Sequence, residues 1–150
     1  MCSSDLREHP DIALVLNMLG YWELRVGQLE VADQHLSEAL GMRAHLVGDQ
    51  DPSYGSSLLT LGSLRIQQQR FSEALLLAQR AEGLFSRDGG DKSWKRAMAE
   101  TVEADALSGL GRRGEARRVA QKALAADWSA AMPQFRAQMQ ATIRRLGASP

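Results

Sequence analysis

Apolar side chains recur along this chain at spacings of three and four residues, and the pattern repeats after 42 residues. Leu16 and Leu19 match Leu58 and Leu61 in this way. One small residue recurs in all three copies, as Ala32, Ala74 and Ala116. Spacings of three and four place apolar side chains on one face of a helix. A repeat of this length is typical of stacked helical hairpins, so we predict an all-α array.

The pattern predicts seven helices and no strand. Two of them begin at matched segments, His9-Pro10-Asp11 and Asp51-Pro52-Ser53, because proline is tolerated in a first helical turn and a polar side chain there accepts free N–H groups. Gly27 and Gly111 mark the turns inside two hairpins, and Gln69 takes that place in the middle one. Residues 86–91 are predicted to form a loop. The predicted helices cover residues 10–26, 29–47, 53–69, 71–86, 92–109, 113–126 and 132–146.

Two glycines at matched positions lie in the middle of predicted helices, where a glycine costs about 1 kcal/mol relative to alanine. Gly20 and Gly62 occupy the same position of the repeat, and Ala104 follows in the third copy. A small residue at one position in all copies indicates close approach of a second helix. We expect Ala32 and Ala74 to be the facing small residues.

The chain resembles the tetratricopeptide repeat, and within it the 42-residue kinesin-light-chain-like variety. The matching segments include Leu16-Asn17-Met18-Leu19-Gly20, Gly27-Gln28-Leu29-Glu30-Val31-Ala32, Arg70-Phe71-Ser72-Glu73-Ala74 and Leu110-Gly111-Arg112-Arg113-Gly114-Glu115-Ala116. The resemblance covers about residues 9–126. It implies a right-handed superhelix of three helix hairpins, with the first helix of each pair lining a concave groove.

The expected organisation has three parts. Residues 1–8 form a non-native or disordered tail, residues 9–128 form three repeats (about 9–50, 51–90 and 91–128), and residues 129–150 form a capping helix and tail. The capping helix has an apolar stripe and a polar outward face; a membrane or partner helix is the alternative. The stripe consists of Phe135, Met139, Ile143 and Leu146, and the outward face of Arg136, Gln140, Arg144 and Arg145.

The N-terminal residues have a composition unlike the repeats. Cys2-Ser3-Ser4-Asp5-Leu6 is what a common sequencing-adapter end encodes in one reading frame. We therefore expect residues 1–6 to be non-native and the chain to be a C-terminal fragment of a longer bacterial protein, the alternative being a natural disordered tail. Cys2 is the only cysteine, which excludes a disulfide within one chain.

Charge is balanced over the whole chain but not along it. Residues 1–60 carry three Arg and nine Asp or Glu, and residues 61–150 carry fifteen Lys or Arg and nine acids, giving −6 and +6. We interpret the basic run as a solvated helix face rather than a nucleic-acid surface, because aromatic residues make up only 5% of the chain. The asymmetry also allows self-association through exposed repeat ends. The run consists of Arg112, Arg113, Arg117, Arg118 and Lys122.

The sequence contains no motif for catalysis, for a cofactor or for a metal. The three histidines have no ligand spacing, and no glycine-rich phosphate loop is present. Glu100 and Glu103 stand where the other copies have leucines, and we expect them to be solvated charges on an exposed helix face. No apolar run approaches the roughly 20 residues that span a bilayer, so we expect a cytoplasmic protein without membrane or nucleic-acid partners.

We therefore expect a non-enzymatic scaffold that binds a protein, as a peptide or a partner helix, in the concave groove. The alternative is a regulatory C-terminal segment of a larger bacterial signalling enzyme, such as a serine/threonine protein kinase or a nucleotide-dependent regulator. The resemblance implies that the groove is lined by Asn17, Tyr21 and Arg25 in the first pair, Leu59, Ser63 and Gln67 in the second, and Thr101 and Asp105 in the third.

Overall fold

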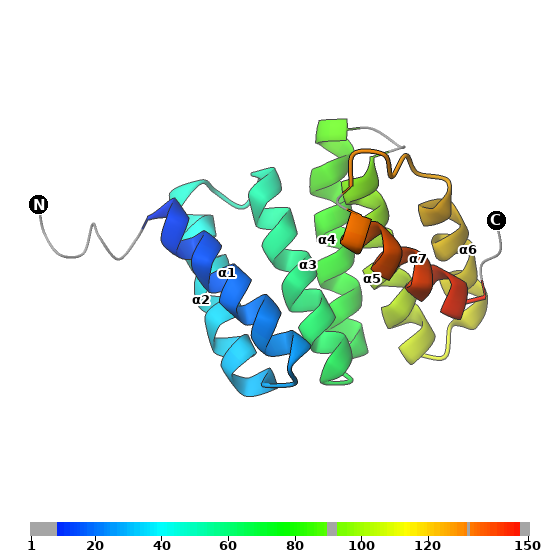
Figure 1. Ribbon diagram of the computed structural model, residues 1–150, viewed down its shortest axis with the longest axis horizontal. Helices are drawn as coiled ribbons and strands as arrows, with labels where there is room; N and C mark the ends of the chain where they lie inside the picture. Colours follow the sequence, from blue (N-terminus) through cyan, green and yellow to red (C-terminus); the bar gives the residue numbers. More distant parts are fainter. Residues whose placement is uncertain (1–8, 90–92, 132, 148–150) are drawn as a thin grey trace, which may run out of the picture.

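The chain folds as consecutive antiparallel helix pairs that stand side by side (Figure 1). The computed structural model describes residues 9–89, 93–131 and 133–147. Its helices are α1 (Pro10–Arg25), α2 (Leu29–Leu46), α3 (Pro52–Gln67), α4 (Phe71–Gly89), α5 (Trp94–Gly109), α6 (Arg113–Leu124) and α7 (Pro133–Arg145). Each of α1 to α6 packs on its neighbour in the sequence, and α7 packs on both α5 and α6. The predicted all-α array of three hairpins and a further helix is confirmed.

Helix ends follow the local chemistry of the sequence. The His9 ring accepts a hydrogen bond from the Asp11 N–H at 3.2 Å, and the Asp51 carboxylate accepts one from the Ser53 N–H at 2.8 Å. A proline follows each of these capping residues, as predicted. One boundary prediction was wrong: α4 continues to Gly89, so the first part of the predicted loop at 86–91 is helical. Residues 90–92 lie outside the described residues.

The turns inside the hairpins require a left-handed residue. Gly27 and Gly111 have φ of 82° and 79°, and Gln69, at the matching position, has φ of 59°. Glycine adopts this conformation without strain, whereas a residue with a Cβ does so at a cost. Within the described ranges the only bridge-type pairing is the isolated Ser93–Asp127 contact.

Close packing at Gly20 explains the small residue in this position. A Cβ added there would lie 2.5 Å from Leu36 Cγ and 3.4 Å from the Ala32 carbonyl oxygen. Gly62 is less tightly enclosed, since its nearest neighbour would be Val102 Cγ1 at 3.2 Å. The expected approach to Ala32 is therefore confirmed, while the tightest contact at Gly62 comes from α5 rather than from Ala74.

Three apolar clusters follow one another along the array. The first joins the first hairpin to α3, the second joins α3, α4 and α5, and the third joins α5, α6 and α7. Ile143 of α7 is fully buried in the third cluster, with Met139 and Leu146 partly buried beside it. The side chain of Phe135, which the predicted stripe also includes, lies outside the described residues. The predicted outward residues do not all face solvent, because Arg136 and Gln140 are only partly exposed.

Candidate protein-interaction surface

The first helices leave one row of side chains open along the array. On α3 this row follows helical spacing between the residues that form the core, and it consists of Ser56, Thr60, Ser63 and Gln67. The residues 42 positions earlier form the matching row on α1, and these are Leu14, Met18, Tyr21 and Arg25. We call these eight residues the first-helix face. On α1 it is apolar and aromatic up to Arg25 at its end, and on α3 it is polar.

The α1 row exposes large apolar side chains. Leu14 is 48% exposed and Met18 51%, and Tyr21 is partly exposed one turn further on. The Tyr21 ring meets the neighbouring Trp22 ring edge to face, with 5.6 Å between their centroids. This contact restrains both rings without covering Met18. An apolar row of this kind is the part of a surface that a partner would desolvate most favourably.

The α3 row presents hydroxyl oxygens. Thr60 Oγ1 donates to the Ser56 carbonyl at 3.2 Å, and Ser63 Oγ donates to the Leu59 carbonyl at 3.0 Å. Because both hydroxyl protons are used within the helix, the oxygens remain as acceptors for donors of a partner. Gln67 is exposed at the end of the row.

In the third pair α7 engages the corresponding residue. Asp105 matches Tyr21 and Ser63, and its Oδ1 accepts from Arg145 Nη2 at 2.5 Å. Burial raises the pKa of Asp105, and the positive charge of Arg145 opposes that rise. The first-helix face is therefore open on α1 and α3, whereas on α5 the matching residue Asp105 is bound by Arg145 of α7.

The structure separates the eight predicted groove residues into different environments. Tyr21, Arg25, Ser63 and Gln67 lie on the first-helix face. Leu59 and Thr101 do not line an open surface, because both are buried. Leu59 packs in the second apolar cluster, and Thr101 Oγ1 donates to the Ala97 carbonyl at 2.8 Å. Their shared position, 42 residues apart, therefore points into the array.

Asn17 occupies that same position on α1 and is only partly exposed. Its Oδ1 is buried and accepts no hydrogen bond. Sequence reasoning missed Leu14 and Met18, although the signal was present. Counting back from Tyr21 along the helix by three residues and then by four leads to Met18 and then to Leu14.

Glu100 is not a solvated charge, contrary to the sequence-based expectation. It is buried between α5 and α6, where its Oε1 lies 2.8 Å from Lys122 Nζ and 3.2 Å from Arg96 Nε. Glu82 of α4 completes the cluster, 3.1 Å from the Arg96 Nε. Two cations therefore stabilise a carboxylate at a position where the other copies have leucine. Burial raises the pKa of Glu103, whose Oε1 accepts a hydrogen bond from Gln79 Nε2 at 3.1 Å.

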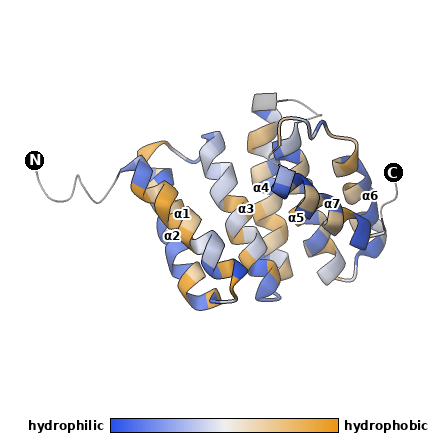
Figure 2. Cartoon of the chain, viewed as in Figure 1, coloured by the Kyte–Doolittle hydropathy of each residue, from blue (hydrophilic) through white to orange (hydrophobic). Residues whose placement is uncertain are grey.

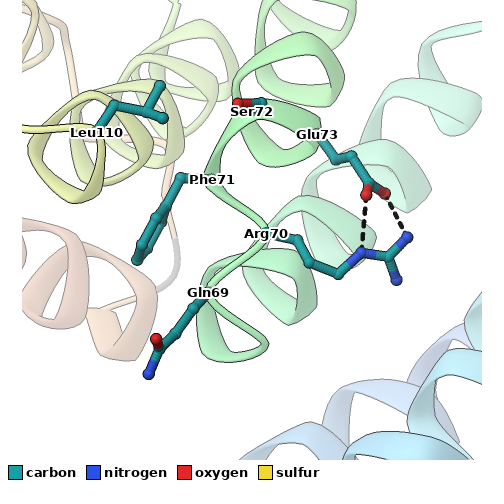
Figure 3. A pocket seen from close by; sticks show the side chains of 6 residues that line it. All are labelled: Gln69, Arg70, Phe71, Ser72, Glu73 and Leu110. Carbon is teal, nitrogen blue, oxygen red and sulfur yellow. Dashed lines mark hydrogen bonds and ion pairs between the residues drawn. The ribbon is translucent and has the colours of Figure 1, made fainter.

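A shallow depression of about 290 Å³ lies at the turn between α3 and α4 (Figure 3). Phe71 and Leu110 border it on one side, and the Arg70–Glu73 ion pair, with Nη2 and Oε2 2.7 Å apart, borders the other. Gln69 and Ser72 complete its lining. Its two charged side chains, Arg70 and Glu73, pair with each other.

Comparison with known families identifies the array. The model of the tetratricopeptide repeat family matches residues 11–87, which is just over half of the chain, and the chain belongs to this family. The match covers the first two hairpins, and α5–α6 continues the same packing order. No curated protein shows significant sequence similarity to the chain. Tetratricopeptide repeats are generally protein–protein interaction modules.

Two further properties concern only the residues that the structure describes. None of their helices combines the length and apolar character needed to cross a membrane. Over the same ranges, His, Cys, Asp and Glu side chains do not gather in groups of three or more that could hold a metal ion.

Proposed function

We propose that this protein is a non-enzymatic scaffold that binds a peptide or a partner helix along the first-helix face. The observation that carries the proposal is the half-exposure of Leu14 and Met18 beside Tyr21. These side chains lie at the positions that α3 fills with Ser56, Thr60 and Ser63, so the array does not need them to be apolar. A partner that covers them gains hydrophobic free energy at about 25 cal/mol per Å².

The two rows favour a partner with two kinds of side chain. Apolar side chains suit the α1 row, and hydrogen-bond donors suit the hydroxyl acceptors of Thr60 and Ser63. An amphipathic helix or an extended segment satisfies both requirements. Each first helix has 16 residues, so each row is roughly 24 Å long at 1.5 Å per residue. The partner segment is therefore expected to be short.

A peptide-display selection tests this proposal. Peptides selected on the full chain should bind wild type and lose at least tenfold in affinity with Met18→Glu, which places a charge in the apolar row. The control is Leu76→Glu, because Leu76 is 67% exposed on α4, outside the first-helix face. Selected peptides that bind Met18→Glu as well as they bind wild type would contradict the proposed site.

The alternative, a regulatory segment of a larger signalling enzyme, stays a prediction from the sequence. It concerns what the scaffold is joined to, and the same first-helix face would then bind its target on behalf of that enzyme.

A further inference from the structure

A second apolar row on α1 lies beside the first-helix face, one residue further along the helix. Val15, Leu19, Trp22 and Val26 follow spacings of four, three and four, which places them on one side of the helix. Trp22 is 62% exposed and Val26 70%. We call these four residues the terminal stripe. Figure 2 shows hydrophobic residues along much of α1.

The matching positions of α3 are used for packing. The residues 42 positions after Leu19 and Trp22 are Leu61 and Leu64, which are buried in the first apolar cluster against the first hairpin. The residue matching Val26 is Gln68, whose Nε2 donates to Asp33 of α2 at 3.2 Å. On α5, Ala99 and Ala106, which match Val15 and Trp22, are buried, whereas Glu103 is partly exposed and Leu110 is exposed. The terminal stripe is therefore the face by which a first helix packs on another helix, and within the described part of the chain no helix covers it.

We propose that a second copy of this chain covers the terminal stripe, with the two α1 helices antiparallel about a two-fold axis. Neighbouring helices of the array are antiparallel (Figure 1), and a two-fold axis perpendicular to α1 gives the second α1 the same relative direction. With Leu19 near the axis, Trp22 of one copy faces Val15 of the other. In the array α3 packs on the preceding hairpin mainly through α2, and α5 does so mainly through α4, and the second α1 would take the place of that antiparallel neighbour.

Charges at the two ends of the stripe complement each other in this arrangement. Asp11 lies one turn before Val15 and Arg25 lies beside Val26, and both are exposed. Antiparallel pairing brings Asp11 of each copy near Arg25 of the other. The net negative charge of residues 1–60 does not oppose the pairing strongly, because two of their carboxylates are already paired with arginines. Asp33 pairs with Arg65, and Asp49 pairs with Arg80.

A head-to-tail contact is less favourable. The opposite end of the array is formed by α6 and α7, whose exposed side chains include Arg113, Arg117, Arg118 and Arg144. Placing the terminal stripe against these arginines would desolvate charges without pairing them. A head-to-tail contact would also leave both ends open and produce growing polymers rather than a dimer.

The expected affinity is modest. A stripe over one helix about 24 Å long buries a few hundred Å² per copy, which is below the roughly 800 Å² per partner of a standard stable interface. We therefore expect a concentration-dependent dimer with a dissociation constant on the order of micromolar or weaker.

Sedimentation equilibrium of the full chain, from low micromolar to several hundred micromolar, tests the proposal. The mass should rise from 16.5 kDa toward twice that value for wild type. Trp22→Glu should stay monomeric. Leu76→Glu changes an apolar residue on α4 that is about as exposed as Trp22, and this variant should dimerise like wild type. Thermal melts establish that both variants are folded. A wild type that stays monomeric, or a dimer that Trp22→Glu does not weaken, would overturn the proposal, as would assemblies that grow beyond two copies.

A charge exchange tests the antiparallel register. Asp11→Arg and Arg25→Asp should each weaken the dimer at least severalfold, because like charges then meet at the ends. The double variant restores opposite charges and should recover most of the wild-type affinity at low salt. A double variant no stronger than the single ones would overturn this register. Peptide binding to Met18 and Tyr21 is measured separately, so failure of the dimer leaves the proposed function untouched.

Discussion

Arg65 of α3 directs both terminal nitrogens of its guanidinium at the carboxylate of Asp33 on α2. Nη1 lies 2.6 Å from Oδ2 and Nη2 lies 3.0 Å from Oδ1. The Arg65 Nε is 3.3 Å from Glu73 Oε2 on α4, so one nearly buried side chain connects three helices of two hairpins. The positions 42 residues after Asp33 and Arg65 hold Leu75 and Leu107, so the third pair has no such clamp.

Asp33→Asn should destabilise the array at neutral pH by roughly 1.5–3 kcal/mol, the usual value of a hydrogen bond to a charged group. Hydrogen bonding from Arg65 lowers the pKa of Asp33. A lowered folded-state pKa means that the carboxylate stabilises the fold above its unfolded pKa of about 3.9. This contribution is lost as the pH falls through the lower folded-state pKa.

Urea unfolding of wild type and Asp33→Asn across that pH range measures the effect. The two curves should converge in strong acid, where Asp33 is protonated in both the folded and unfolded states. Ser37→Ala is the control, because Ser37 is exposed and donates to the same carboxylate without joining two hairpins. A constant difference at all pH values would show that Asp33 acts by packing alone.

Gly20→Ala and Gly41→Ala should change stability in opposite directions. At Gly20 the new Cβ meets the fully buried Leu36, so overpacking should cost roughly 1–3 kcal/mol. Gly41 is exposed within α2 with nothing within 4 Å, so alanine there should stabilise the helix by about 0.5–1 kcal/mol. Chemical unfolding of the two variants gives both values. An equal gain from both substitutions would exclude close helix packing at Gly20.

The fold was predictable from the sequence because the signals were local and repeated three times. The helix boundaries were predicted within a few residues from helical spacing, from Pro10 and Pro52, and from the turn glycines. The continuation of α4 beyond Ser86 to Gly89 was missed because glycine and aspartate nearby are typical of loops. In the structure the Ser86 Oγ donates to the Glu82 carbonyl, so this polar residue is accommodated within the helix.

The candidate site was predictable only in part. Periodicity identifies a helix face, but it does not say which neighbour covers that face, and Leu59 and Thr101 are buried for that reason. Glu100 was misinterpreted on similar grounds. Its partner Lys122 lies 22 residues away on another helix, and only the packing of α5 on α6 brings the two charges together.

Gln69→Gly should stabilise the protein by about 0.5 kcal/mol or more. Gln69 adopts a left-handed conformation that costs roughly 1–2 kcal/mol for a residue with a Cβ, and glycine removes this strain at a smaller cost in unfolded-state entropy. The opposite change, Gly27→Ala, should destabilise the first hairpin by about 1 kcal/mol. Thermal melts of both variants provide the comparison. A loss of stability in Gln69→Gly would mean that the Gln69 side chain contributes more than its strained backbone costs.

Glu100→Gln should alter how stability depends on pH. Burial raises the pKa of Glu100, and Lys122 and Arg96 only partly oppose this effect. The contribution of a group with a raised pKa is fully present below its unfolded pKa of about 4.3 and is lost as the pH rises through the folded-state value. The variant lacks this loss, so its stability relative to wild type should increase as the pH rises through that window.

Urea titrations from pH 4 to pH 8 would show the change. Glu38→Gln, on the exposed side of α2, should leave the free energy of unfolding within about 0.5 kcal/mol of wild type. A relative stability of Glu100→Gln that falls with increasing pH would mean that the two cations outweigh the burial of the carboxylate.

Ile143→Asp should release α7 from the array while leaving the three hairpins folded. Ile143 of α7 is fully buried in the third cluster, where α7 packs on α5 and α6. A charge at this position has no partner among the apolar residues of that cluster. Release would expose Ala120, Ala123 and Trp128, so binding of an apolar dye and aggregation should both increase. It would also leave Asp105 without Arg145.

Arg144→Asp changes an exposed residue next to Ile143 and is the matched control. Because α7 follows the hairpins in sequence and, among the helices that the structure describes, contacts only α5 and α6, the helical content should fall by no more than the length of α7. A variant with unchanged helicity, dye binding and solubility would contradict the role of α7 as a cap.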